Sequence, residues 1–176
     1  MPPQIIFPVH LALGYVACLL CFSTYALPKL KSMERMEAQR VIATVHSFRF
    51  FGLVFILPGV VGPNLPATFA TFAAYGDFAT GILAILALLT VRVRPLFWSL
   101  VVAFNLVGTV DLILAYYQAV RGGLPAVAGQ LGAAYAIPIV YVPVLMITHI
   151  LALYWLVRPQ PTMAFEGHFM KEKTHA

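Results

Sequence analysis

Charged side chains are scarce in this sequence, which has 11 Lys and Arg and 6 Asp and Glu among 176 residues. Hydrophobic residues make up 61% of the chain, and the mean hydropathy is +0.90. A soluble domain needs more charged and polar residues than this on its surface. The composition therefore excludes an ordinary soluble domain. It predicts a protein that lies in a lipid bilayer.

Cysteine is also rare: the two copies, Cys18 and Cys21, both lie inside an apolar run. They offer no disulfide framework, and no second pair is present for a zinc site. The basic residues are spread over short segments rather than gathered on one face, so we expect no nucleic-acid partner. Phosphate-binding loops, nucleophile elbows and HExxH motifs are absent, so nothing favours the chemistry of soluble enzymes.

Long apolar runs are what the sequence does contain. They fall at 6–27, 41–61, 73–91, 96–119 and 134–157. Each is close to the roughly 20 residues that a helix needs to cross a bilayer. Because backbone groups in lipid must be hydrogen-bonded within their own segment, these runs predict helices rather than strands. We therefore predict an all-α fold, a single membrane domain over residues 1–176 built as a bundle of five transmembrane helices.

Most of the positive charge lies in the first and third connections and in the C-terminal tail, whereas the other two connections carry only Arg121. The residues of the first set are Lys29, Lys31, Arg35, Arg40, Arg92, Arg94, Arg158, Lys171 and Lys173. The positive-inside rule then predicts an external N-terminus and a cytoplasmic C-terminus. We expect an integral protein of a bacterial cytoplasmic (inner) membrane. The stretch 121–134 either lies on the outer surface or dips back into the membrane, and both remain open.

Polar residues inside the predicted helices are few, and such residues are the usual pointers to function in a membrane protein. Counted from the cytoplasmic ends at about 1.5 Å per residue, they form two layers. The inner layer holds His46, Arg49, Asn105 and His149, and the outer layer holds Asp77 and Asp111. Small residues share a helix face with each aspartate, which favours close packing of the two helices and an approach of the two carboxylates.

One arginine set against two aspartates leaves a net charge of minus one when both acids are ionised. An unpaired charge in lipid is costly, so the expected resting state pairs Arg49 with one aspartate and puts a proton or a cation on the other. The alternative is that Arg49, Asp77 and Asp111 form only a structural lock between helices.

The leading hypothesis is a small transporter or channel-like protein that binds a proton, a cation or a small ligand. Its expected site residues are Asp77, Asp111, Arg49, Asn105 and Gln118. A second hypothesis makes His46 and His149 axial ligands of a b-type haem, or ligands of a divalent metal. A third is a membrane enzyme for a lipid or sterol-like substrate, in which an aspartate and a histidine exchange protons. A subunit of a larger membrane complex and a homo-oligomer are further possible assemblies, since small-residue faces favour helix association.

Overall fold

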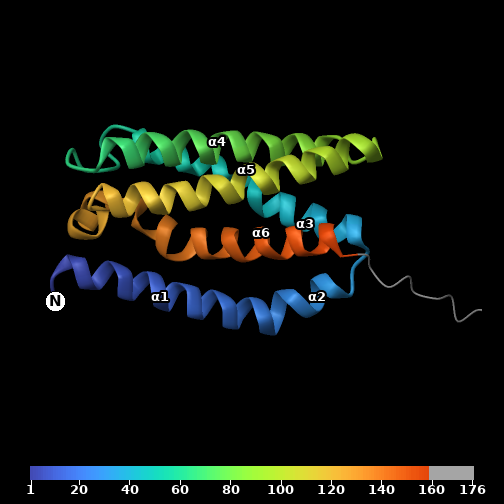
Figure 1. The fold of residues 1–176 in the computed structure, drawn as a ribbon, viewed down its shortest axis with the longest axis horizontal. Helices are drawn as coiled ribbons and strands as arrows, with labels where there is room; N and C mark the ends of the chain where they lie inside the picture. Colours follow the sequence, from blue (N-terminus) through green and yellow to red (C-terminus); the bar gives the residue numbers. More distant parts are fainter. Residues whose placement is uncertain (159–176) are drawn as a thin grey trace, which may run out of the picture.

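The computed structural model describes residues 1–158, and its regular elements are all helical (Figure 1). In chain order they are α1 (Pro3–Cys21), η1 (Phe22–Ala26), α2 (Leu27–Lys31), α3 (Arg35–Ser47), η2 (Phe48–Ile56), α4 (Ala67–Leu89), α5 (Arg94–Arg121), η3 (Leu124–Tyr135), η4 (Ile137–Tyr141) and α6 (Val142–Val157). The all-α prediction is confirmed. The predictions made on Lys171 and Lys173 lie outside the described residues.

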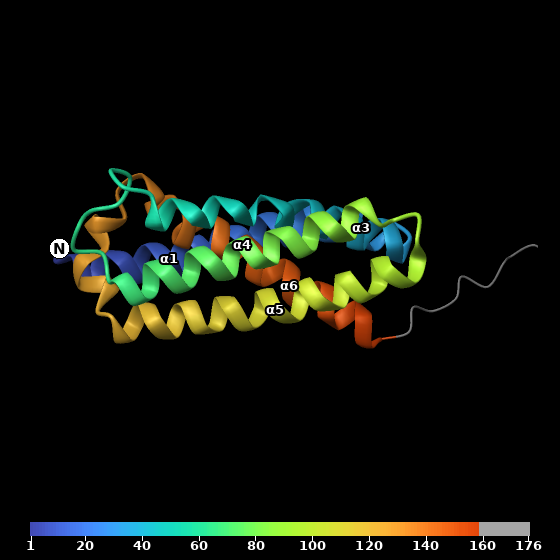
Figure 2. The same cartoon turned by 90° about the horizontal axis from the view of Figure 1, so that it is seen from above.

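Four helical stretches within residues 1–158 are long and apolar enough to cross a membrane: Pro3–Lys31, Ala67–Leu89, Arg94–Arg121 and Ile137–Val157. They correspond to the first, third, fourth and fifth predicted helices, with ends shifted by a few residues. The second predicted helix, 41–61, corresponds to α3 and η2, which run alongside α4 (Figures 1 and 2). The findings therefore support an integral membrane protein.

The α3–η2 segment begins and ends earlier than the apolar run indicates. It starts at Arg35 and ends at Ile56, after which Leu57 has an extended backbone with φ −83° and ψ 119°. Leu57 precedes Pro58, and a residue before proline is sterically disfavoured in the helical region. Gly59, at φ +83°, then turns the chain back toward α4.

The helix α1 lies at the edge of the bundle, where it packs against η3, η4 and α6 (Figure 1). Only 6% of the residues in its apolar stretch are buried, against 33–39% in the other three long helices. The sequence had placed all of the deep polar residues on the other helices. The same division is seen here, because the polar interior is built without α1.

The stretch 121–134 closes one end of the bundle as part of η3. Its side chains at Leu124, Ala128, Leu131 and Ala134 are buried in an apolar cluster with aromatic residues of α1, η2 and α4. The loop between η2 and α4 is hydrogen-bonded to η3, since the Gly62 N–H donates to the Gln130 carbonyl at 2.7 Å. Gly132, at φ +53°, faces the Val60 carbonyl where a Cβ would collide.

A second apolar cluster fills the opposite end of the bundle, between α3, α4, α5 and α6. Its buried members are Ile42, Ala43, Ala84, Ala87, Phe97, Val101, Phe104 and Ala152. The two clusters leave a layer between them in which buried polar side chains meet. That layer holds the candidate site.

Candidate functional site

Arg49 is the centre of the polar layer, and its side chain is fully buried. Its Nε donates to Asp77 Oδ1 at 2.7 Å, and its Nη2 lies 2.6 Å from the same oxygen and donates to Asp111 Oδ2 at 2.5 Å. Its Nη1 lies 3.3 Å from the Gly108 carbonyl and 3.1 Å from His149 Nε2. The guanidinium thus makes four hydrogen bonds and one further ion-pair contact to Asp77. One arginine therefore joins four helical elements: η2, α4, α5 and α6.

The two carboxylates fit into this layer because glycines face them. A Cβ at Gly52 would collide with the Asp77 carboxylate, and a Cβ at Gly76 would collide with the Asp111 carboxylate. Asp77 is 6% exposed and Asp111 5% exposed. Asp111 Oδ1 is fully covered and has no hydrogen-bond partner within the described part of the chain. The site therefore holds two buried acids, one of them with an unsatisfied oxygen.

His149 is held as a neutral ring with its proton on Nδ1. Its Nε2 lies opposite Arg49 Nη1, which can only donate, so Nε2 must accept. Its Nδ1 then donates to Asn105 Oδ1 at 2.9 Å, while the Asn105 amide nitrogen donates to the Val101 carbonyl. His149 and Asn105 thus form a directed chain behind the arginine.

His46 lies beside His149, with the two ring centroids 3.9 Å apart and the planes inclined by 35°. His46 Nε2 is 3.0 Å from the Thr148 hydroxyl, which also lies 2.8 Å from the Val144 carbonyl. His46 Nδ1 is buried and has no partner among residues 1–158. The two histidines predicted to share a layer do share one, as stacked rings.

The three-ten geometry of η2 explains how Arg49 reaches this layer. A three-ten helix has three residues per turn, so side chains three apart lie on one line. The buried residues of η2 are Arg49, Gly52 and Phe55, and buried His46 precedes them at the same spacing. In an α-helix each step of three would drift by about 60° around the axis. The change of helix type keeps the polar line facing α4.

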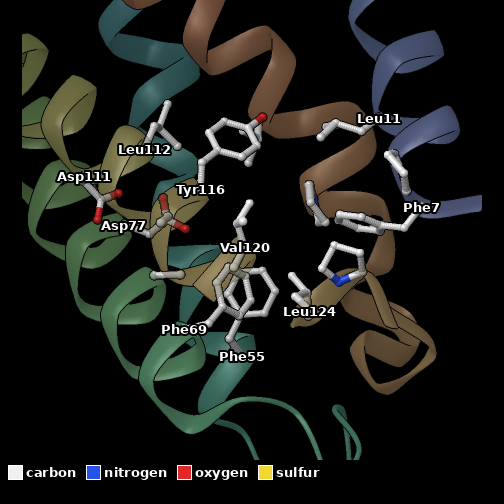
Figure 3. A pocket seen from close by; sticks show the side chains of 17 residues that line it. Phe7, Leu11, Phe55, Phe69, Asp77, Asp111, Leu112, Tyr116, Val120 and Leu124 are labelled. Carbon is white, nitrogen blue, oxygen red and sulfur yellow. The ribbon is translucent and has the colours of Figure 1, made fainter. Parts of the chain in front are cut away.

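An apolar cavity of about 160 Å³ begins at the carboxylates and extends to α1 (Figure 3). Asp77 and Asp111 lie side by side at one end, and Phe7 and Leu11 of α1 lie across from them. The other lining residues are Pro8, Phe55, Phe69, Ala73, Leu112, Ala115, Tyr116, Ala119, Val120, Leu124, Pro125, Pro138 and Val142. Arg49, His46 and His149 do not line it. The acids therefore separate the cavity from the arginine and the histidines.

The charges of the layer do not balance when both acids are ionised. Arg49 supplies one positive charge, Asp77 and Asp111 supply two negative charges, and His149 is neutral by its hydrogen bonds. The ion pairs that these acids form within the described residues are both with Arg49. A proton or a cation at the acids would restore neutrality. A net charge buried in a medium of low dielectric constant is energetically costly.

The two histidines do not fit the haem hypothesis. Axial ligands point ring nitrogens at an iron that lies between them, whereas these two rings lie directly against each other, with centroids 3.9 Å apart and planes inclined by 35°. Both nitrogens of His149 are hydrogen-bonded, and Nε2 of His46 is bonded as well. Within the described residues, no group of three or more His, Cys, Asp or Glu side chains is placed to hold a metal ion.

The structure brings together all but one of the predicted site residues. Gln118 lies apart, in a separate hollow between α4 and α5 that Thr71 and Tyr75 also line. The two predicted layers also form one network rather than two, because the Arg49 side chain spans the gap between them. For the enzyme hypothesis, a proton passing from an aspartate to His149 would have to cross the Arg49 guanidinium.

Sequence reasoning missed several residues of the site. Gly52 and Gly76 make room for the acids, and Thr148 orients His46. Small residues were noted beside each aspartate, but not these two glycines. The available signal was their position, since Gly76 directly precedes Asp77 and Gly52 follows Arg49 by three residues.

The fold and the site define a class: an all-helical protein with stretches long and apolar enough to span a membrane, and a buried arginine–aspartate–histidine network beside an apolar cavity. Within that class, the chain belongs to a family described as a domain of unknown function, DUF8737, whose model matches residues 6–157. No curated protein and no solved structure matches the chain.

Proposed function

We propose that this protein is a small transporter or channel-like membrane protein that binds a proton or a cationic group at Asp77 and Asp111. The observation that carries the proposal is that two buried carboxylates share one arginine at the end of an apolar cavity. A structural lock would be more stable with balanced charge and with no adjoining space, since an uncompensated buried charge is costly. The charge imbalance and the adjoining cavity favour a site that binds and releases a proton or a cationic group.

The proposal includes five membrane crossings, with α3 and η2 together forming the second. This segment covers 35–56 and runs beside α4 between the same two ends of the bundle (Figure 2). The first and third connections and the C-terminal end of α6 lie at one end of the bundle, while the C-terminal end of α5 and η3 lie at the other (Figures 1 and 2). The positive-inside rule then puts the basic end in the cytoplasm and the N-terminus outside. A bacterial cytoplasmic membrane is the proposed location.

Beyond the Arg49 guanidinium, buried polar groups continue toward the basic end of the bundle. His149 and His46 follow Arg49, and Gln39 lies seven residues before His46 on α3, or about 10 Å along the axis. Gln39 Oε1 and His46 Nδ1 are both buried without a partner among the described residues. Unsatisfied buried polar atoms mark positions that water can occupy.

The test is proton flux in proteoliposomes that enclose a pH-sensitive dye. A potassium diffusion potential, negative inside, is applied, and acidification of the interior is followed. We expect the native protein to carry protons faster than protein-free liposomes. Asp77→Asn and Asp111→Asn each should reduce the flux to that background, because a neutral amide cannot take up or release the proton.

The matched control is Glu37→Gln, which removes an acid from the surface pair with Arg40, where both side chains are about half exposed. It should leave the flux unchanged. Monodisperse elution in detergent verifies that each variant folds. A native protein that gives no more than background flux, or folded aspartate variants with full flux, would overturn the proposal.

A further inference from the structure

We infer that the cavity binds an organic monoamine: an ammonium group at Asp77 and Asp111 with a ring-sized apolar part against Phe55, Phe69 and α1. The inference rests on the proposed cation site at the two aspartates. It adds the class of ligand and the route by which the ligand enters.

The charge at the inner end selects the ligand's polar group. Arg49 makes one hydrogen bond and one further ion-pair contact with Asp77, and both are to Oδ1, so the arginine does not engage Oδ2 of that carboxylate. Asp111 Oδ1 also has no partner in the described part of the chain, but it is covered and lies against Gly76, so Asp111 contributes negative charge rather than an open acceptor. An ammonium group supplies the missing positive charge and several N–H donors at once. A carboxylate or phosphate would add to the excess of negative charge.

The walls select the rest of the ligand. Apart from the two acids and the Tyr116 hydroxyl, the lining is apolar, and Tyr116 is already hydrogen-bonded to Tyr15 at 2.8 Å. No other lining side chain offers a hydrogen bond, so a second polar group on the ligand would lose its water without replacement. The volume of about 160 Å³ is close to the roughly 150 Å³ of an engineered protein cavity that binds benzene.

The mouth of the cavity lies between α1 and α5. Pro8 and Val120 both line the cavity and are both exposed, Val120 by 73%. The Tyr15–Tyr116 hydrogen bond joins these two helices on the side nearer the middle of the bundle. At the other end η3 covers the cavity through Leu124 and Pro125. The opening therefore faces sideways between two apolar helices, which suits a ligand dissolved in lipid.

The test uses the full chain in lipid nanodiscs and a hydrophobic carbodiimide, a reagent that couples to protonated carboxyl groups in apolar sites. The rate at which the protein gains one reagent mass is followed by mass spectrometry, and Asp77→Asn and Asp111→Asn identify the labelled acid. N,N-Dimethylbenzylamine, benzyl alcohol and benzenesulfonate are the probes, because they share one ring and differ in charge. The tertiary amine forms no stable amide with an activated acid, and the sulfonate replaces a carboxylate that would consume the reagent.

We expect N,N-dimethylbenzylamine to slow labelling by about tenfold or more near saturation, and the alcohol and the sulfonate to have little effect at equal concentration. Ala115→Leu, which fills the cavity, should abolish the protection. Ala103→Leu is the matched control, since Ala103 is a half-buried alanine of the same helix that does not line the cavity. Val120→Trp at the mouth should slow labelling in the absence of any amine, and Val102→Trp should not.

Equal protection by benzyl alcohol would overturn the selection of a cation, and no protection by N,N-dimethylbenzylamine would overturn the inference as a whole. Labelling that Val120→Trp leaves unchanged would overturn the lateral entrance. These outcomes are separable from the proposed function. Proton flux without amine protection leaves the proposed function standing alone, and amine protection without flux leaves a binding site that does not transport.

Discussion

At the scale of single residues, Arg49 makes more side-chain hydrogen bonds than any other described residue. It brings a positive charge into a layer with no other described cation, and it makes four hydrogen bonds there. The planar guanidinium is what allows one residue to contact two carboxylates, a carbonyl and an imidazole at once.

We predict that Arg49→Lys destabilises the protein although it keeps the charge. A lysine has three donors on one nitrogen and cannot reach all four partners, so buried acceptors would be left unsatisfied at a cost of about 2 kcal/mol or more. The measurement is the midpoint of thermal unfolding in detergent, followed by tryptophan fluorescence. Arg40→Lys, in an exposed pair, is the control and should change the midpoint little.

We predict that Gly76→Ala disturbs the site as strongly as a change to a charged residue. The added methyl group would collide with the Asp111 carboxylate, which must then move away from Arg49. Overpacking of this kind costs about 1–3 kcal/mol. Gly129→Ala is the matched control, because a Cβ there meets open space. Equal unfolding midpoints for the two variants would contradict the tight fit between α4 and α5.

The stacked histidines give a spectroscopic prediction. Because their rings face each other and three of their four nitrogens are hydrogen-bonded, protein expressed with added haem should show no Soret absorption after purification. If an absorption band appears and His46→Ala together with His149→Ala removes it, the two rings must separate to bind haem. That result would restore the haem hypothesis.

At the scale of elements, the segment α3–η2 shows what the spacing of buried residues along the sequence can predict and what it cannot. Residues 46, 49, 52 and 55 are spaced by three, and over a single step this spacing fits either an α-helix or a three-ten helix. The apolar run therefore predicted a helix correctly but could not give its type. Packing against α4 decides the type, because the three-ten form keeps the buried line straight through Phe55.

The attachment of α1 to α5 is a second feature of this scale. We predict that Tyr116→Phe, which removes the hydrogen bond to Tyr15, lowers the unfolding free energy by only about 1 kcal/mol. It should also raise the rate of carbodiimide labelling, since the two helices would separate more easily at the cavity mouth. Tyr117→Phe is the control, because Tyr117 is the next residue along the helix and its exposed hydroxyl contacts Arg121 instead. An unchanged rate of labelling in Tyr116→Phe would contradict the view that this hydrogen bond holds the two helices together at the cavity mouth.

At the scale of the whole molecule, the number of crossings has a direct test by single cysteines, introduced after Cys18 and Cys21 are replaced by alanine. With five crossings, Asn64→Cys and Ala126→Cys should react with a membrane-impermeant maleimide in intact cells. Ser32→Cys and Arg92→Cys should react only after the membrane is opened. If Ser32→Cys and Asn64→Cys label from the same side, α3–η2 does not cross.

The sequence by itself determined that the chain is helical and apolar enough to lie in a membrane, because hydropathy and helix length are local properties of each segment. It also singled out Asp77, Asp111, Arg49, His46, His149 and Asn105, because a polar residue in an apolar run is visible without any partner. It also named Gln118, which the structure places apart from the other predicted residues, in the hollow that Thr71 and Tyr75 line.

Only the tertiary structure decided how these residues meet. Which atoms Arg49 contacts depends on the rotation and separation of four elements, and no single segment carries that information. The glycines at 52 and 76 have meaning only because a carboxylate of another element approaches each of them. The cavity likewise exists because α1, α5 and η3 surround it without filling it, which is a property of packing between distant segments.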